Sequence, residues 1–532
     1  MKILLFVSFL LFGCSSFNHQ DAKLKLRILH TNDHHGHYLA DKDGQYGMAA
    51  RKTKLDQLRS DIKKQSGGSL LLSGGDINTG TMESDVFDAK PDFLGMKKLG
   101  YDVMAIGNHE FDNDFKVLLQ QKQWAGFPFL SANIFYKKTG KRVFDPAYII
   151  KEINGVKVGI FGLTTIDTPF KASSDDAKKM FEFKPIIEAA KPIVDELKLK
   201  VDVVIAVTHI GHHGSETSNG DIKLAQAVDG IDVIVGGHSQ EIINAEVHNN
   251  TIIVQAEDWG KYIGVLDLFI TKEHIIADHQ YKLEPINLKK SDGDKKVLIA
   301  DYIEPNQEMI DLFKPFQEKA EKIGSQKVGI LMKDLSAQRK DVRSKQMPIG
   351  QFIGECFKHQ VSDVDLVVLN GGSIRGGLVA GDISRKDLHR VHPYGNTIAT
   401  VKMSAQELFD YMSVVAKFSH VNPKHLIGGY PQISFATLIM KDNELIGLKD
   451  PEGKWSIEKV NGAIQTNKKS FTLGTMNFVA KGGDNYPKLT ANPTYTDTGF
   501  MVNAAMMNYA MVKKKVDTTK FEKSIQTVFE NK

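Results

Sequence analysis

Cysteine is scarce in this sequence, and neither sign of charge predominates. Only Cys14 and Cys356 occur among 532 residues, so a fold held together by several disulfides is excluded. The 68 basic and 64 acidic residues give a net charge of +4, which argues against a surface that coats nucleic acid and leaves anion binding to local clusters. No internal repeat or low-complexity tract stands out. We therefore expect two or more globular domains with packed cores and, if the ligand is anionic, a small ligand.

The first residues of the chain are typical of an export signal. One lysine precedes residues 3–12, an apolar run too short to span a bilayer as a mature helix. Residues 11–14, Leu-Phe-Gly-Cys, resemble the lipobox of bacterial lipoproteins, in which the cysteine is lipidated. We expect Cys14 to carry the lipid and the protein to lie in the periplasm or at the outer membrane. Ordinary cleavage is the alternative. Cys356 follows a helical pattern and is expected to be a buried structural thiol.

Hydrophobic patterning divides the rest of the chain into two regions. In residues 23–303 strands alternate with helices, and we expect strands at 24–29, 69–72, 103–106, 156–161, 201–207 and 231–235 and helices at 49–64 and 185–198. A charged helical segment, 304–323, is either a connection between domains or the last helix of the first domain. Residues 324–528 are expected to hold strands at 365–369, 397–403 and 471–475 and helices at 405–416 and 500–513.

Side chains that bind metals gather where the expected strands of the first region end. They form five motifs, at residues 30–37, 73–76, 107–112, 208–212 and 236–240. Sheets of α/β proteins carry their ligands at such strand ends. Two neighbouring divalent cations need a bridging carboxylate with imidazole and amide ligands on each side, and the five motifs supply that mixture. One strand-end histidine alone would be unremarkable as a structural residue, but five motifs in this order predict a two-metal centre.

Spacing within the motifs suggests how the side chains converge. Asp33 and His35 stand at alternate positions, as do His238 and Gln240, so we expect an extended backbone to point both members of each pair the same way. The same alternation turns His34 away from the first pair. We expect four histidines near the motifs to lie outside the metal shell: His34, His37, His212 and His213.

These motifs resemble those of the calcineurin-like metallophosphoesterases, and within them the bacterial periplasmic 5'-nucleotidase and UDP-sugar hydrolase group. The most specific are Gly-Asn-His-Glu-Phe-Asp at 107–112 and Gly-Gly-His-Ser-Gln at 236–240. The resemblance implies an α/β protein with an N-terminal four-layer β-sandwich flanked by helices, a linker helix and a C-terminal α+β nucleotide-binding domain. It also implies two divalent ions, zinc, manganese, cobalt or magnesium, one held by Asp33, His35, Asp76 and Gln240 and the other by Asp76, Asn108, His209 and His238.

The resemblance further assigns the catalytic side chains. His109 would contact the phosphate and protonate the leaving oxygen, and Asp112 would orient and charge its ring. The alternative is that the two form a structural pair with little effect on rate. In the C-terminal region, guanidinium groups match phosphate oxygens, and exposed aromatic rings can stack on a nucleobase. By resemblance the nucleotide-binding residues are Arg339, Arg343, Arg375, Tyr394, Asn396, Gly428, Phe478 and Asp484.

Taken together, these residues predict a hydrolase of nucleoside 5'-monophosphates outside the cytoplasm, with nucleoside di- and triphosphates or UDP-sugars as further substrates. Two alternatives stay open: a 2',3'-cyclic-nucleotide phosphodiesterase with 3'-nucleotidase activity, and a lipid-tethered nucleotide-binding protein without catalysis. The intact set of expected ligands argues against the second. We expect small nucleotides as partners, no nucleic acid, membrane contact only through the lipid anchor, and a monomer.

Overall fold

The computed structural model describes residues 24–531, apart from residues 173, 175, 215–217, 294, 395, 420–427 and 525–528. Cys14 and the expected export signal lie outside the described residues. Among those that are described, none of the helices combines the length and the apolar character needed to cross a bilayer.

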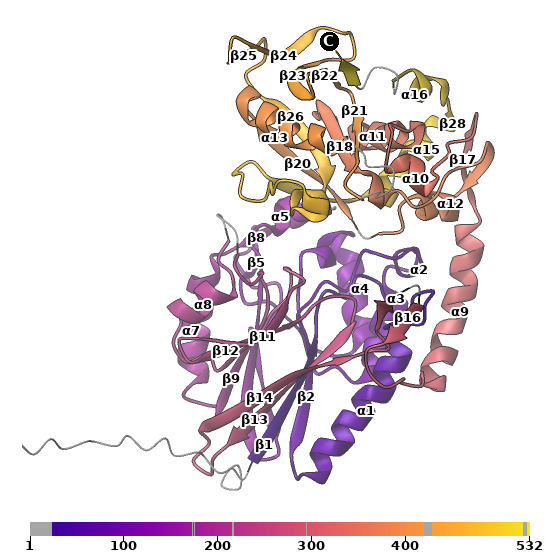
Figure 1. Ribbon diagram of the computed structural model, residues 1–532. Helices are drawn as coiled ribbons and strands as arrows, with labels where there is room; N and C mark the ends of the chain where they lie inside the picture. The colour runs from indigo at the N-terminus through magenta and orange to yellow at the C-terminus, as the bar shows by residue number, and fades with distance from the viewer. Residues whose placement is uncertain are drawn as a thin grey trace, which may run out of the picture.

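Two six-stranded sheets form the N-terminal half (Figure 1), with the orders β14-β13-β1-β2-β3-β4 and β11-β12-β10-β9-β7-β6. The first contains β1 (Leu24–Thr31), β2 (Gly68–Ser73), β3 (Val103–Ala105), β4 (Phe129–Leu130), β13 (Tyr262–Ile270) and β14 (Ile276–Pro285). The second contains β6 (Tyr148–Ile153), β7 (Val156–Thr164), β9 (Val203–His209), β10 (Val233–Val235), β11 (Ile242–His248) and β12 (Thr251–Ala256). Two small ribbons are also present, β5 (Ile134–Tyr136) with β8 (Phe181–Phe183) and β15 (Lys289–Asp292) with β16 (Lys295–Leu298).

The alternation of side chains along the strands accounts for the layers. On β1, Leu26 and Ile28 face the core between the two sheets, whereas Leu29 packs on the opposite face. Helices α1 (Met48–Lys64), α3 (Lys90–Leu99) and α4 (Phe115–Ala125) cover the outer face of the first sheet, and α7 (Ile186–Leu197) and α8 (Asp221–Ala227) cover that of the second. The short helices are α2 (Met82–Asp85), η1 (His109–Phe111), α5 (Thr168–Lys171) and α6 (Asp176–Met180). The expected four-layer sandwich is confirmed.

Helix α9 (Gln307–Gly324) runs along one side of the molecule from the N-terminal half to the C-terminal half (Figure 1). Asn306 caps its first turn by accepting a hydrogen bond from the Met309 N–H at 3.1 Å. Met309 and Phe313 are buried in the core beneath α1 and α3. The first half of α9 therefore packs against the N-terminal half.

The C-terminal half is built on three sheets, with the orders β21-β18-β26-β20-β27, β19-β17-β28 and β25-β24-β23-β22-β29. Its strands are β17 (Lys327–Leu331), β18 (Leu366–Asn370), β19 (Gly381–Ser384), β20 (Thr397–Met403), β21 (Pro431–Ser434), β22 (Thr437–Lys441), β23 (Glu444–Lys449), β24 (Trp455–Val460), β25 (Ala463–Thr466), β26 (Phe471–Met476), β27 (Thr496–Met501), β28 (Lys515–Val516) and β29 (Phe529–Asn531). Its helices are α10 (Arg339–Val342), α11 (Pro348–Gln360), η2 (Gly371–Ser373), α12 (Arg385–Val391), α13 (Ala405–Lys417), α14 (Asn477–Ala480), η3 (Gly483–Asn485), α15 (Val502–Lys513) and α16 (Thr519–Ser524).

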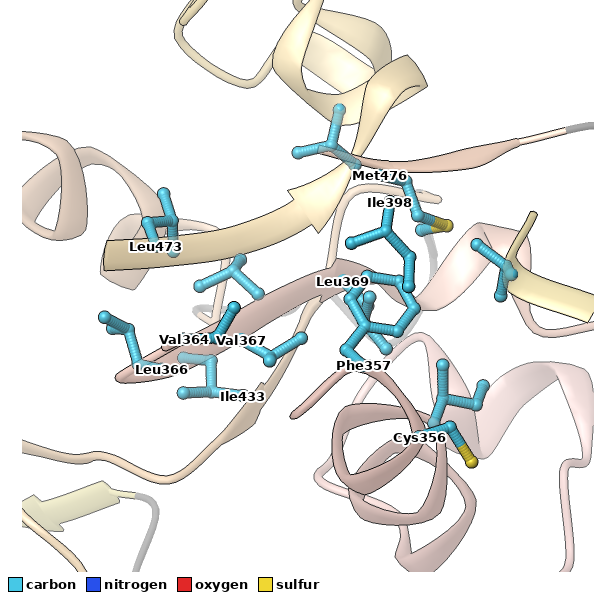
Figure 2. Close-up of a cluster of buried hydrophobic side chains, with 14 of the residues drawn as sticks. Cys356, Phe357, Val364, Leu366, Val367, Leu369, Ile398, Ile433, Leu473 and Met476 are labelled. Atoms are coloured by element: carbon cyan, nitrogen blue, oxygen red, sulfur yellow. The ribbon is translucent and has the colours of Figure 1, made fainter. Parts of the chain in front are cut away.

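Figure 2 shows part of the C-terminal core, where Phe357 of α11 lies near Leu369 of β18 and Ile398 of β20, and Cys356 lies on another side of the same helix. Cys356 is fully buried, and burial raises the pKa of its thiol well above the ordinary value, so the expectation of a structural thiol is confirmed. The expected helix at 500–513 begins two residues late, at Val502. The reason is that Met501 pairs with Thr397 as the end of β27.

Candidate active site

All five motifs follow strands of the two N-terminal sheets and meet at a shared edge. The loop after β1 is tied to the loop after β2, because the N–H groups of Asp33 and His35 donate to the carbonyl oxygens of Gly75 and Asp76, each at 3.0 Å. The second sheet joins them through His209, whose Nδ1 donates to the carbonyl oxygen of Gly74 at 2.7 Å. Loops far apart in sequence thus form one structure.

The expected extended backbone at the paired ligands is wrong. The φ angles of Asp33 and His35 are +51° and +49°, and those of His238 and Gln240 are +79° and +55°. Left-handed conformations are costly for residues other than glycine and persist only where neighbours hold them. The side chains still converge: the Nε2 atoms of His35 and Gln240 are 3.0 Å apart, and the Asp33 carboxylate accepts from the His238 N–H at 3.0 Å.

Asp76 lies at the centre of the cluster and is buried. Its Oδ2 is 2.9 Å from His209 Nε2, 3.9 Å from His35 Nε2 and 4.0 Å from His109 Nε2. His238 Nδ1 lies 3.2 Å from His209 Nε2. Two groups of side chains, His35 with Asp76 and His109, and Asp76 with His209 and His238, each bring their ligand atoms within 4.8 Å of one another. Asp76 belongs to both groups, as a bridging ligand must.

The donor set fits divalent cations in three respects. His35 and His209 donate Nδ1–H to carbonyl oxygens at 2.9 and 2.7 Å, which leaves the Nε2 lone pairs directed at the cluster. The Oδ1 atom of Asn108 is buried and has no hydrogen-bond partner among the residues that the structure describes. Burial raises the pKa of Asp33 to about 7; His209 opposes this rise and the charge of Asp76 adds to it. Nitrogen and oxygen ligands in this mixture suit zinc, manganese, cobalt or magnesium.

Glycines allow the loops to approach so closely. A Cβ atom on Gly107 would lie 2.1 Å from Asp76 Oδ1, and one on Gly74 would lie 2.5 Å from the carbonyl oxygen of Gly236. Any side chain at these two positions would therefore push the loops apart and displace Asp76.

His109 and Asp112 form a tight pair beside this cluster. His109 Nδ1 is 2.6 Å from Asp112 Oδ2, and the His109 N–H donates to Asp76 Oδ1 at 2.9 Å. Burial lowers the pKa of His109, but the carboxylates of Asp112 and Asp76 outweigh burial and raise the pKa to about 10. The two carboxylates therefore favour the protonated form of the imidazole, which is the form that can donate a proton.

Sequence reasoning missed two side chains that hold this arrangement. Glu110 is buried, and its carboxylate accepts hydrogen bonds from the N–H groups of Asp76, Ile77 and Gly107 at 3.0, 2.7 and 2.7 Å. Thr79 donates from its hydroxyl to Asp112 Oδ2 at 2.5 Å. An acidic residue inside the motif at 107–112 was a signal for Glu110, whereas nothing in the sequence around Thr79 marks it.

The four histidines that were expected to lie near the motifs but outside the metal shell make other contacts. His34 Nε2 lies 3.1 Å from Asp92 Oδ1, and the ring of His37 stacks on Trp259 with centroids 4.1 Å apart. His212 Nε2 lies 3.2 Å from Glu246 Oε2, and the ring of His213 packs against that of His212.

A cavity of about 630 Å³ lies between the two halves of the molecule and reaches this cluster. From the N-terminal half it is lined by His35, Thr79, His109, Gln240, Asp258, Trp259 and Lys261. From the C-terminal half seven of the expected nucleotide-binding residues line it: Arg343, Arg375, Tyr394, Asn396, Gly428, Phe478 and Asp484. Arg339 does not line the cavity and is exposed.

Contacts within the C-terminal wall fix these side chains. Asp484 accepts a hydrogen bond from Asn370 Nδ2 at 2.6 Å, and a Cβ atom on Gly428 would lie 2.6 Å from Asp484 Oδ2. The guanidinium carbon of Arg375 lies 5.7 Å from the centre of the Tyr394 ring, within the range of a cation–π contact. Phe478 is 42% exposed, which leaves its ring available for stacking.

Comparisons with known proteins agree with this geometry. Residues 26–241 match the calcineurin-like phosphoesterase family, and residues 322–491 match the 5'-nucleotidase C-terminal domain. The chain is 39% identical to a 5'-nucleotidase of Vibrio cholerae, over 97% of this chain and 96% of the relative. It is also 39% identical to protein UshA of Escherichia coli, over 94% of each chain.

Solved structures share the fold. The NAD nucleotidase of Haemophilus influenzae superposes with a TM-score of 0.70 at 21% identity, covering 96% of this chain and 99% of that one. A 5'-nucleotidase precursor of Thermus thermophilus gives a TM-score of 0.57 at 22% identity, covering 95% and 99%. With two matched domains and identity along almost its whole length, the chain belongs to the bacterial 5'-nucleotidase family and is a metal-dependent phosphoric monoester hydrolase.

Proposed function

We propose that the protein hydrolyses nucleoside 5'-phosphates to nucleoside and phosphate outside the cytoplasm, for nucleotide scavenging, with nucleoside di- and triphosphates or UDP-sugars as further substrates. One observation carries this proposal: a single cavity is lined both by the metal-ligand candidates His35 and Gln240 and by the arginine and aromatic side chains of the C-terminal half. Its volume, about 630 Å³, suits a nucleotide-sized ligand. A phosphate could thus face the metal centre while its base contacts the opposite wall.

Two divalent cations would be held by residues of four loops and by His209 at the end of β9. Asp33, His35, Asp76 and Gln240 would bind one ion, and Asp76, Asn108, His209 and His238 the other. When bound, such ions neutralise charge on the phosphoryl oxygens and provide an acidified water as the nucleophile. The chain contributes the positioning, since the carbonyl oxygens of Gly74 and Thr79 fix the imidazoles of His209 and His35.

His109 would act as the general acid. Asp112 holds Nδ1 and stabilises the protonated ring, so that Nε2 can give its proton to the departing ribose oxygen. Because the ring also lines the cavity, it would contact the phosphoryl group as negative charge builds there. The two side chains would therefore assist the leaving group rather than the nucleophile.

The C-terminal wall would select the substrate. Arg343 and Arg375 would bind phosphate oxygens, and Tyr394 and Phe478 would stack on the base. Asn396 can pair with a base edge and Asp484 with ribose hydroxyls, while Gly428 leaves room for that carboxylate. Arg339, which is exposed, would add charge near Arg343 rather than a direct contact in this arrangement.

A phosphate-release assay tests the proposal. The purified protein is offered 5'-AMP, 3'-AMP, 2',3'-cyclic AMP and UDP-glucose, after chelation and after addition of each metal. We expect 5'-AMP to be the best of the adenine substrates and Asp76→Ala to abolish release. Preference for 3'-AMP or the cyclic nucleotide would instead support the phosphodiesterase alternative. Nucleotide binding without any release would support the binding-protein alternative.

For the chain as a whole, we propose a signal and tether at residues 1–22, a phosphoesterase domain at 23–303, a linker helix at 304–323 and a nucleotide-binding domain at 324–528, anchored by lipid on Cys14. Fractionation of cells that express the Cys14→Ser variant tests the anchor. We expect the variant to leave the membrane fraction, and unchanged membrane association would contradict the proposal.

A further inference from the structure

Thr79, in the loop that follows β2, contacts both parts of the proposed machinery. Its hydroxyl donates to Asp112 Oδ2 at 2.5 Å, and its carbonyl oxygen accepts from His35 Nδ1 at 2.9 Å. The same Asp112 oxygen faces His109 Nδ1 at 2.6 Å. A single residue therefore connects an expected metal ligand to the expected acid and its carboxylate.

The backbone of Thr79 is strained. Its φ angle is +65°, in the left-handed region that a β-branched residue rarely occupies and that glycine or asparagine would adopt more easily. The loop is held in place by its neighbours, because Glu110 accepts from the Ile77 N–H and Asn78 exchanges amide hydrogen bonds with Gln121. A threonine in such a position indicates that its side chain contributes more than its backbone conformation costs.

The space around Asp112 shows what that contribution is. Besides the main cavity, a second cavity of about 290 Å³ lies between the two halves, and Asp112, Thr79 and Arg385 all line it. A carboxylate beside such a space has room to rotate away from His109. The Thr79 hydroxyl opposes this rotation, since a hydrogen bond to a charged oxygen is stronger than one between neutral groups.

We propose that Thr79 is a positioning residue for hydrolysis: its hydroxyl holds Asp112 against His109 so that the imidazole stays aligned with the substrate. The inference rests on the proposed roles of His109 and Asp112. It predicts that loss of the hydroxyl alone slows the chemical step and that serine, which keeps a hydroxyl on Cβ, restores it.

The first test compares the full chain with Thr79→Val, which keeps the shape, and Thr79→Ser, which keeps the hydroxyl. With 5'-AMP we expect Thr79→Val to lower kcat by about 10- to 100-fold, the usual effect of removing such an outer hydrogen bond, and Thr79→Ser to recover most of the activity. Thr251→Val is the matched control, because this buried hydroxyl donates to the carbonyl oxygen of Ile231, in a different part of the molecule. It should lower the melting temperature and leave kcat unchanged.

The second test repeats the Thr79 substitution in an Asp112→Ala background. If Thr79 acts through Asp112, Thr79→Val should cause no further loss of kcat there. An equal loss in both backgrounds, or wild-type kcat in Thr79→Val itself, would overturn the inference. Wild-type kcat in Asp112→Ala would overturn the role of Asp112 instead, so the two failures are distinguishable. If Thr79→Val does not fold, Thr79→Ala removes the hydroxyl with less bulk and carries the same comparison.

Discussion

Replacing Glu110 by glutamine should loosen the metal centre although Glu110 is not an expected ligand. Its Oε2 accepts from the N–H groups of Asp76 and Gly107, and its Oε1 accepts from that of Ile77. Glutamine has the same shape but turns one oxygen into an NH₂ group, which would face two backbone N–H donors on either side, because Oε1 also accepts from the Asn78 N–H at 3.4 Å. Each buried donor left without an acceptor costs about 1 to 3 kcal/mol.

We therefore expect Glu110→Gln to destabilise the fold by about 2 to 6 kcal/mol, since two donors lose their acceptor and the penalties at one carboxylate oxygen add roughly. For a domain of this size that corresponds to a fall in melting temperature of at least about 4 °C. Because the Asp76 N–H is one of the donors, metal affinity should also fall, by about 10- to 100-fold. Calorimetric unfolding and metal titration of the purified variant measure the two effects.

A matched control comes from Glu407, an exposed carboxylate that accepts from the Ser404 N–H at the start of α13. Water can replace the lost acceptor there, so Glu407→Gln should change stability by less than about 0.5 kcal/mol. The reasoning about Glu110 fails if Glu110→Gln and Glu407→Gln unfold alike, or if Glu110→Gln binds metal as tightly as the parent protein.

Three further predictions concern the cavity and the pH dependence of stability. Phe478→Ala should lower kcat/KM for 5'-AMP by about 10- to 100-fold, through loss of about 1 to 3 kcal/mol of stacking, and should spare ribose 5-phosphate, which has no base; equal losses would refute stacking. Arg375→Ala should raise KM for 5'-AMP more than Arg339→Ala, because Arg375 lines the cavity and Arg339 does not, and the reverse order in steady-state assays would contradict that placement. Burial raises the pKa of Asp232, so the contribution of this carboxyl to the free energy of unfolding is most favourable below its unfolded pKa and declines as pH rises through its folded pKa. Asp232→Asn should remove this decline. If the unfolding free energies of the variant and the parent protein ran parallel with pH above pH 4, the raised pKa would be refuted.

Strand positions, and the place of the candidate ligands at the strand ends, were predictable because both depend on local pattern. The apolar runs of β7 and β9 stand out in the sequence, and the metal-binding side chains follow the strand ends directly. The backbone conformation at Asp33 and His35 was not predictable, since a positive φ at a residue other than glycine is imposed by hydrogen bonds to Gly75 and Asp76 from another loop. The role of Thr79 was not predictable for the same reason, because its contacts are with Asp112 and His35 of other loops.

Boundaries and exposure were also set by long-range contacts. The start of α15 depends on the pairing of Met501 with Thr397, about a hundred residues earlier in the chain, and a helical pattern of side chains gives no sign of that pairing. Arg339 and Arg343 are equivalent in sequence, four residues apart, yet only Arg343 reaches the cavity, because the two stand at opposite ends of the single turn α10.

The metal centre concentrates several unfavourable features in one place. Asp33 and Asp76 are both buried, five expected ligands adopt positive φ angles, and Asn108 Oδ1 has no partner among the described residues. Bound cations would compensate the two carboxylates and the amide oxygen together, so metal binding should add to the stability of the folded state. Chelation should accordingly lower the melting temperature as well as abolish phosphate release, and each metal that restores activity should restore the melting temperature too. If a metal restored activity without raising the melting temperature, the buried carboxylates and the Asn108 oxygen would already be compensated by contacts within the protein.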